Sequence, residues 1–368
     1  MLIMSMGSVA SAQWGEMDVR PLTISPPAEY VPRDEGRIQQ ARWHFPGFTL
    51  ERLATLLSGV GFNASDVGDL TKSAKVDSAP AGLAIEPGPA FIRRIKPDVR
   101  ARLYAELAKA PSNFDQASAY YFHGDSIDIW LGTESVSPRV RALVDPLIYR
   151  IGDFLYLADI EVVRQELGSG PDFQNLVRRL LRQSAMFVSI SINDRDELDD
   201  VTEYWGRGGR KTDIRPLLES IADAGPSQAI DLSQLLPDLP RRLLYRYPKV
   251  TLADLEKPQL ENCFWTALNF FNDEPDDRFL DVTFAMNTLR RDYFLVHDRL
   301  QLGDIAVFSS RDMNVFHVAV YLAQGLVFTK NGAFSLAPWT ILPIDQLKGP
   351  YVGHADDWVV TYYRRKDL

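Results

Sequence analysis

Apolar and polar positions alternate most regularly in the last third of the chain, and this part predicts an antiparallel sheet. Residues 305–308 form a short apolar run, residues 317–322 continue it after a polar loop, and further strands are expected over 326–331 and 358–363. Because successive side chains of a strand point to opposite faces, His317 is expected on one face and Val318 on the other. Two helices are expected in the same part, one beginning at Cys263 and one over 282–293.

The first two thirds of the chain have apolar residues at helical spacing and predict a mostly helical region. One strand is expected over 186–192, and helices are expected over 48–57, 97–110, 173–183 and 139–167, the last being one helix or two broken at Asp145-Pro146. Proline-rich residues 226–248 predict a linker. The expected fold class is therefore α+β, with a signal remnant or extended arm over 1–47, a mainly helical domain of open role over 48–240, and a C-terminal domain over 241–368.

Composition indicates a globular protein and excludes several classes of function. Hydrophobic residues make up 46% of the chain, and 40 basic residues against 49 acidic ones give a net charge of −9, which argues against nucleic acid as a partner. No apolar run is long enough to predict a transmembrane helix. The single cysteine excludes an intramolecular disulfide, and the His and Cys spacing predicts no metal site; no cofactor is expected.

The first residues, MLIMSMGSVASAQW, carry small residues in an Ala-Ser-Ala pattern ending at Ala12, which is typical of a signal-peptide cleavage site. No Lys or Arg precedes Arg20, and the apolar stretch is short. The segment is therefore either the remnant of an export signal, which implies a periplasmic or secreted protein, or an unstructured terminus of a cytoplasmic one.

Cys263 lies at a position that favours a reactive thiol. Apolar residues follow it at helical spacing and Asn262 is a good N-cap, so Cys263 is expected at the first position of a helix. There the unpaired amides and the helix dipole favour a thiolate, and the Cys263 N–H points to where an oxyanion would form. The alternative for a lone cysteine is a small buried apolar residue.

His317 and a nearby polar side chain complete a candidate catalytic set with Cys263. His317 opens a strand, where the alternative is a structural histidine bonded to a backbone carbonyl. In GLVFTKNG, residues Thr329 and Asn331 share one face, so either side chain could accept the second ring N–H of His317. The amide oxygen of Asn331 is the stronger acceptor, and Cys263, His317 and Asn331 are predicted as the catalytic residues, with Thr329 as the alternative third residue.

Four segments, NCFWTALNFF, LQLGDIAVF, HVAVYLAQG and VFTKNG, resemble in this order the NlpC-type cell-wall peptidases, a bacterial branch of the papain-like cysteine peptidases. The resemblance covers roughly residues 245–368 and implies a papain-like domain with a helix packed on an antiparallel sheet. The third polar residue of that family, counted from the histidine, falls on Thr329, and its tyrosine upstream of the cysteine corresponds to Tyr245 or Tyr247. Asn262 and Tyr247 are candidate contacts for the oxyanion or the substrate. The family carries Asp-Cys-Ser-Gly, whereas this chain has Asn262-Cys263-Phe264-Trp265, with bulky residues where small ones leave room beside the sulfur.

The resemblance implies a thiol hydrolase that cleaves peptide or isopeptide bonds in bacterial cell-wall peptides, which agrees with the secreted location that the N-terminal pattern favours. The expected partner is a peptide or a peptidoglycan fragment, and the N-terminal helical region is a candidate surface for a protein partner. Two alternatives stay open. The same thioester chemistry supports acyl transfer, as in relatives of lecithin-retinol acyltransferase, and the three residues are also compatible with a catalytically inactive scaffold.

Overall fold

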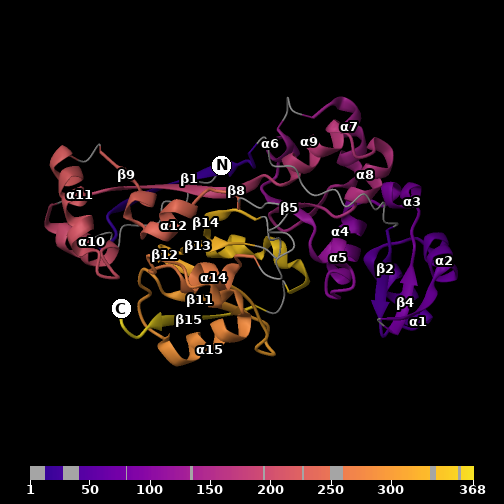
Figure 1. Cartoon of the computed structure of the whole chain (residues 1–368). Helices are drawn as coiled ribbons and strands as arrows, with labels where there is room; N and C mark the ends of the chain where they lie inside the picture. Colours follow the sequence, from indigo (N-terminus) through magenta and orange to yellow (C-terminus); the bar gives the residue numbers. More distant parts are fainter. Residues whose placement is uncertain are drawn as a thin grey trace.

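A computed structural model of the chain describes residues 13–27, 41–79, 81–132, 136–193, 195–225, 228–248, 260–331, 337–354 and 358–368. Helices and antiparallel sheets are mixed along the whole chain, as the expected α+β class requires (Figure 1). The buried apolar residues form two large cores, one built from residues between 43 and 180 and one from residues between 186 and 341. The predicted signal remnant over 1–12 lies outside the described residues.

The N-terminal unit surrounds the first core and contains two small sheets. One has the order β2-β4-β3 and the other β5-β7-β6, each fully antiparallel. The strands are β2 (Trp43–Pro46), β3 (Lys75–Ser78), β4 (Ala81–Ile85), β5 (Tyr120–His123), β6 (Tyr149–Ile151) and β7 (Phe154–Leu157). The helices are α1 (Leu50–Val60), α2 (Ala64–Ser73), α3 (Pro89–Arg94), α4 (Pro97–Leu107), α5 (Phe114–Ala117), α6 (Ile127–Leu131), α7 (Pro138–Val144), η1 (Asp145–Leu147), α8 (Ile160–Leu167) and α9 (Pro171–Leu180).

A long ribbon runs from the N-terminal unit along the second core. Strand β1 (Glu16–Ile24) pairs over its whole length with β8 (Gln183–Ser191), and the short β9 (Ile230–Asp231) adds a third strand (Figure 1). Beyond the ribbon lie η2 (Arg195–Glu197), α10 (Leu198–Trp205), α11 (Lys211–Ala224), η3 (Leu232–Leu235) and α12 (Asp238–Leu243). The inward-facing residues of β8 belong to the second core, so the ribbon is part of the C-terminal unit.

The C-terminal unit is built on a six-stranded antiparallel sheet of order β10-β15-β11-β12-β13-β14. Its strands are β10 (Tyr293–Val296), β11 (Ile305–Ser309), β12 (Val315–Ala323), β13 (Leu326–Lys330), β14 (Trp339–Pro343) and β15 (Val359–Arg365). The remaining elements are α14 (Cys263–Leu268), η4 (Asp277–Leu280), α15 (Val282–Asp292) and η5 (Ile344–His354). The four predicted strands of this region are confirmed, whereas β10 and β14 were not expected.

The two faces of this sheet carry separate apolar clusters. Val318, Val320 and Phe328 belong to the second core, which also contains the buried residues of α14. Ala319 and Val327 belong to a smaller cluster on the opposite face, together with Leu347 of η5. Helix α14 therefore packs on the face to which Val318 points, and the alternation predicted along this strand is confirmed.

Three expectations about the rest of the chain are wrong. Residues 139–167 are not one helix or two adjacent helices, because the β6–β7 hairpin separates α7 from α8 around Gly152, whose φ of +56° suits the turn. Residues 226–248 are not a linker, because five of their leucines, from Leu232 to Leu244, lie in the second core. For the same reason the boundary between the two cores lies near residue 183, well before the predicted boundary at 240, and the residues before it contain strands as well as helices.

Candidate functional site

Cys263 is the first residue of α14, as predicted. The Asn262 side chain caps this helix by accepting a hydrogen bond of 2.9 Å from the Trp265 N–H. Cys263 is half-buried and packs against the second core. Burial raises the pKa of its thiol, while the backbone N–H of Val318 and the positive charge of Lys330 act in the opposite direction. The thiolate expected from the helix position is thus opposed by desolvation, which is the larger effect.

His317 is fully buried on β12, and two hydroxyl groups bind its ring. Its Nε2 lies 2.9 Å from Thr329 Oγ1, and its Nδ1 lies 2.8 Å from the Tyr351 hydroxyl. A neutral imidazole has one N–H and one bare nitrogen, so one hydroxyl accepts from the ring and the other donates to it. Burial lowers the pKa of His317 to about 3, and the ring is therefore neutral at physiological pH.

The Cys263 thiol lies beside the residue that follows His317, but it forms no hydrogen bond with the His317 ring in the described structure. The thiol faces the backbone of Val318, the residue next to His317, on the side of the sheet that α14 covers. The His317 ring packs against Phe308 and Tyr351, and Phe308 belongs to the cluster on the other face. Both residues lie in the described part of the chain, and no hydrogen bond links Cys263 Sγ to the ring there.

Thr329, and not Asn331, is the third polar residue at the His317 ring. Thr329 is buried and holds Nε2, so the choice of Asn331 as the ring partner is wrong, and the alternative position two residues earlier is correct. Asn331 is only 5% exposed, yet neither its amide nitrogen nor its amide oxygen has a hydrogen-bond partner among the described residues. The reason is that β13 ends at Lys330 and the chain leaves the sheet at Asn331.

The two candidate contacts for the oxyanion or substrate have structural partners. Asn262 uses its amide oxygen for the helix cap, and its amide nitrogen donates to the Leu280 carbonyl at 3.3 Å. Tyr247 is buried, and its hydroxyl donates to the Leu181 carbonyl at 2.7 Å, so it fastens the segment before α14 to the end of α9. The other upstream tyrosine, Tyr245, points its hydroxyl at the Met186 carbonyl of β8.

Two residues beside the predicted set were missed. Tyr351, in η5, binds the ring nitrogen of His317 that Thr329 leaves open. Lys330 is 2% exposed, and its ammonium group donates to the Glu261 carbonyl at 2.7 Å, just before α14. The sequence did carry a signal for Lys330, since a charged residue within the apolar run LVFTK is unusual in a buried strand. Tyr351 gives no such signal, because its approach to His317 depends on how η5 packs against the sheet, 34 residues further along the chain.

The Gly-Asp turn that contributed to the resemblance has a structural role. Gly303 has a φ of +89°, and a Cβ atom there would lie 2.1 Å from the Phe271 ring, so only glycine fits. Asp304 is fully buried and accepts two hydrogen bonds of 2.8 Å from Arg364 of β15. The turn therefore fixes the start of β11 against β15 and does not contact the thiol.

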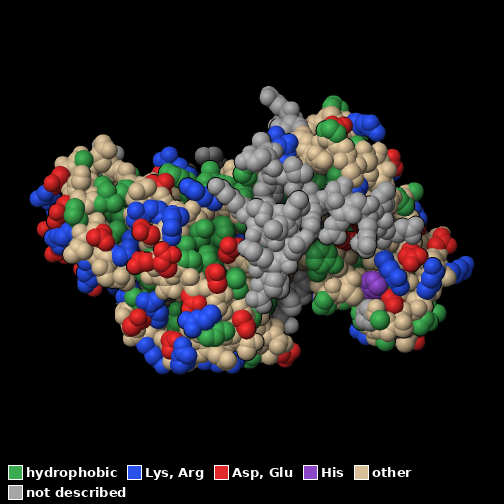
Figure 2. All heavy atoms as spheres, in the orientation of Figure 1, with side chains coloured by type: hydrophobic (Ala, Val, Ile, Leu, Met, Phe, Trp, Pro, Cys, Tyr) green, Lys and Arg blue, Asp and Glu red, His purple; other side chains and the backbone are tan. Residues whose placement is uncertain are grey.

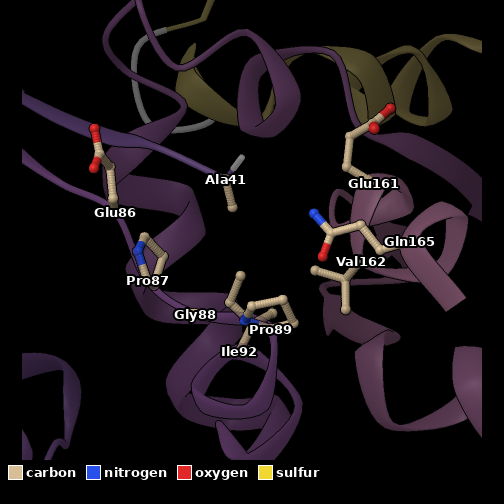
Figure 3. Close-up of a pocket in the computed structure, with 9 residues that line it drawn as sticks. All are labelled: Ala41, Glu86, Pro87, Gly88, Pro89, Ile92, Glu161, Val162 and Gln165. Carbon is tan, nitrogen blue, oxygen red and sulfur yellow. The ribbon is translucent and has the colours of Figure 1, made fainter. Parts of the chain in front are cut away.

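A cavity of about 200 Å³ in the N-terminal unit is a second place where a ligand could bind. Ile92 and Val162 form part of its apolar wall, and the amide of Gln165 points into it (Figure 3). Glu86 and Glu161, at its rim, already pair with Lys75 and Arg164. The cavity therefore offers no free charge to define a ligand.

The face of the molecule drawn in Figure 2 is mixed in charge. Figure 2 shows Lys and Arg side chains interspersed with Asp and Glu over the face drawn. Among the described residues, no group of three or more His, Cys, Asp or Glu side chains is arranged to hold a metal ion. None of the helices described here combines the length and the apolar character that crossing a membrane requires.

Comparisons of the chain with protein-family models, with curated proteins and with solved structures each find no match.

Proposed function

We propose that this protein is a cysteine hydrolase that cleaves an amide bond, with Cys263 as the nucleophile and His317 as the proton carrier. The resemblance to NlpC-type peptidases makes a peptide or isopeptide bond of a bacterial cell-wall peptide the preferred substrate, and a periplasmic or secreted location follows from it. The observation that carries the proposal is the juxtaposition of Cys263, at the start of α14, with the strand residue next to His317, whose Nε2 is held by Thr329.

The reaction divides into two acyl-transfer steps. The Cys263 sulfur attacks the substrate carbonyl while its proton passes to Nδ1 of His317, and the imidazolium returns that proton to the leaving amine. Water then attacks the thioester carbonyl, giving one proton to the same nitrogen, and the thiol recovers a proton as the carboxylic acid leaves. Thr329 accepts the N–H of Nε2 throughout and thereby keeps Nδ1 as the basic nitrogen.

This reaction requires one rearrangement of the described structure. The Tyr351 hydroxyl occupies Nδ1, and the thiol is not bonded to the ring, so the described form is a resting state in which both groups are neutral. Substrate binding has to move Tyr351 away from Nδ1 and also turn the start of β12, because the His317 ring lies on the face of Phe308 whereas the sulfur lies on the opposite face, under α14. Catalytic hydrogen bonds are often long or poorly aligned in the free enzyme and tighten only when substrate is bound.

A catalytically inactive scaffold is the second candidate. The hydrogen bonds of both His317 ring nitrogens to hydroxyl groups favour this candidate, because a histidine with two such partners needs no other role than a structural one. In this case the N-terminal helical region would bind a protein partner, and the C-terminal unit would be an inactive part of the scaffold.

Hydrolysis of muropeptides by the full chain tests the proposal. We expect the wild-type protein to release free amino groups and Cys263→Ala to release none, because alanine removes the nucleophile but fits the same space. Matched thermal unfolding of the two proteins is the control for folding. Equal turnover by the variant, or no turnover by either protein on amide substrates, contradicts the cysteine mechanism.

A further inference from the structure

Lys330 is a buried lysine, and the cost of burying its charge calls for a physical explanation. Its side chain is 2% exposed at the end of β13, and burial of an ammonium group is costly unless anions or dipoles surround it. One of its hydrogen atoms binds the Glu261 carbonyl at 2.7 Å, and the Trp339 ring lies 4.7 Å from Nζ. The carbonyl and the ring face stabilise a cation, but they use only part of its capacity for three hydrogen bonds.

The sheet directs Lys330 toward Cys263. Val320 faces Phe328 across the two strands, and alternation places Lys330, two residues after Phe328, on the same face. This face carries α14, and the carbonyl that Lys330 binds precedes Cys263 by two residues. The Nζ atom of Lys330 therefore lies near the N-terminus of α14, whose first residue is Cys263.

We propose that Lys330 is a positioning residue whose buried ammonium group is the counter-ion of the Cys263 thiolate. The role rests on the proposed function in that a thiolate forms during its catalytic cycle. Two charges act on the ammonium against the effect of burial, the Glu261 carboxylate and the Cys263 thiolate. In the described form His317 lies on the other face of β12 and is neutral, so it supplies no positive charge to the sulfur. Burial lowers the pKa of Lys330 to about 8, so the ammonium is charged at neutral pH, and there its charge opposes the effect of burial that raises the pKa of the Cys263 thiol.

The pH dependence of thiol ionisation tests this role without a substrate. Because Cys263 is the only cysteine, thiolate ultraviolet absorbance and the mass added by iodoacetamide both report on it alone. We expect Lys330→Met to move the midpoint of ionisation upward by about one pH unit, which corresponds to about a tenfold lower alkylation rate at neutral pH. Lys330→Arg, which keeps the charge, should restore most of the rate. The matched control is Lys348→Met, which removes an exposed lysine lying 5.7 Å from the Trp358 ring.

A reciprocal measurement covers the case in which Lys330→Met does not fold. The electrostatic coupling between two groups acts equally in both directions, so Cys263→Ala should lower the pKa of Lys330. Nitrogen NMR of the Lys330 ammonium group measures this pKa. An unchanged thiol midpoint in a folded Lys330→Met protein, or an unchanged Lys330 titration in Cys263→Ala, overturns the inference. Neither result depends on turnover, so failure of the proposed function would appear separately, as absent hydrolysis with the coupling intact.

Discussion

Among the single residues, the one that orients His317 matters most, because it fixes which ring nitrogen is basic in the proposed mechanism. Thr329 holds Nε2, whereas the buried amide of Asn331 has no partner among the described residues. Sequence alternation correctly placed Thr329 on the face of His317, but it could not exclude Asn331, because that choice depends on where β13 ends. Asn331 was predicted because its amide oxygen is the stronger hydrogen-bond acceptor, but the geometry of β13 places Thr329 at the ring instead.

Thr329→Val should therefore impair hydrolysis more than Asn331→Ala does. Valine keeps the shape of threonine but removes the hydroxyl, so His317 loses one buried hydrogen bond worth about 1 to 1.5 kcal/mol, and we expect kcat to fall about tenfold. Asn331→Ala removes an amide that does not touch the ring and should leave kcat within about a factor of two. Measuring kcat for both variants on one amide substrate compares them. The opposite order would restore Asn331 as the functional residue.

At the scale of elements, the Gly-Asp turn shows how a short motif acts through a distant strand. Asp304 is buried, and its two hydrogen bonds to Arg364 join the start of β11 to β15. The motif could be read from the sequence, but its partner could not, because 60 residues separate the two side chains. The β6–β7 hairpin was missed for a related reason, since a short apolar run fits a helix and a buried strand equally well.

Arg364→Met should destabilise the protein strongly, because it leaves the Asp304 carboxylate buried without its partner. Removing one member of a buried ion pair costs about 3 to 5 kcal/mol. The neighbouring Arg365→Met is the control, since Arg365 pairs with a largely exposed Asp367 and its loss should cost about 0 to 1 kcal/mol. Urea unfolding of the two variants measures the difference. Equal free energies of unfolding would show that the Asp304 pair does not hold the sheet.

At the scale of the whole molecule, the division into units follows the cores and not the proline content. Residues between 186 and 244 supply much of the second core, including the buried positions of β8, α10 and α12, so they belong with the C-terminal sheet (Figure 1). The sequence suggested a linker there because prolines interrupt the helical pattern, but Leu232 and its apolar neighbours are needed to cover the sheet. Long-range packing of this kind leaves no local pattern in the chain.

A fragment of residues 183–368 should consequently fold, and a fragment of residues 241–368 should not. The shorter fragment exposes the part of the second core that residues from Met186 to Leu239 cover. The longer one keeps all the buried residues of the second core, although it loses the pairing of β1 with β8 and the hydrogen bonds of Tyr247 to Leu181 and of Tyr156 to Gly349. Circular dichroism and the cooperativity of thermal unfolding distinguish the two. A cooperatively folding 241–368 fragment would contradict this division.

Mass spectrometry of the intact protein, quenched with acid during turnover of an amide substrate, is the sharpest test of whether Cys263 carries a covalent acyl intermediate. We expect an added mass equal to the acyl part of the substrate, located on Cys263 and removed by hydroxylamine. Hydrolysis with no adduct at any quench time, while Cys263→Ala keeps full activity, would contradict the covalent mechanism.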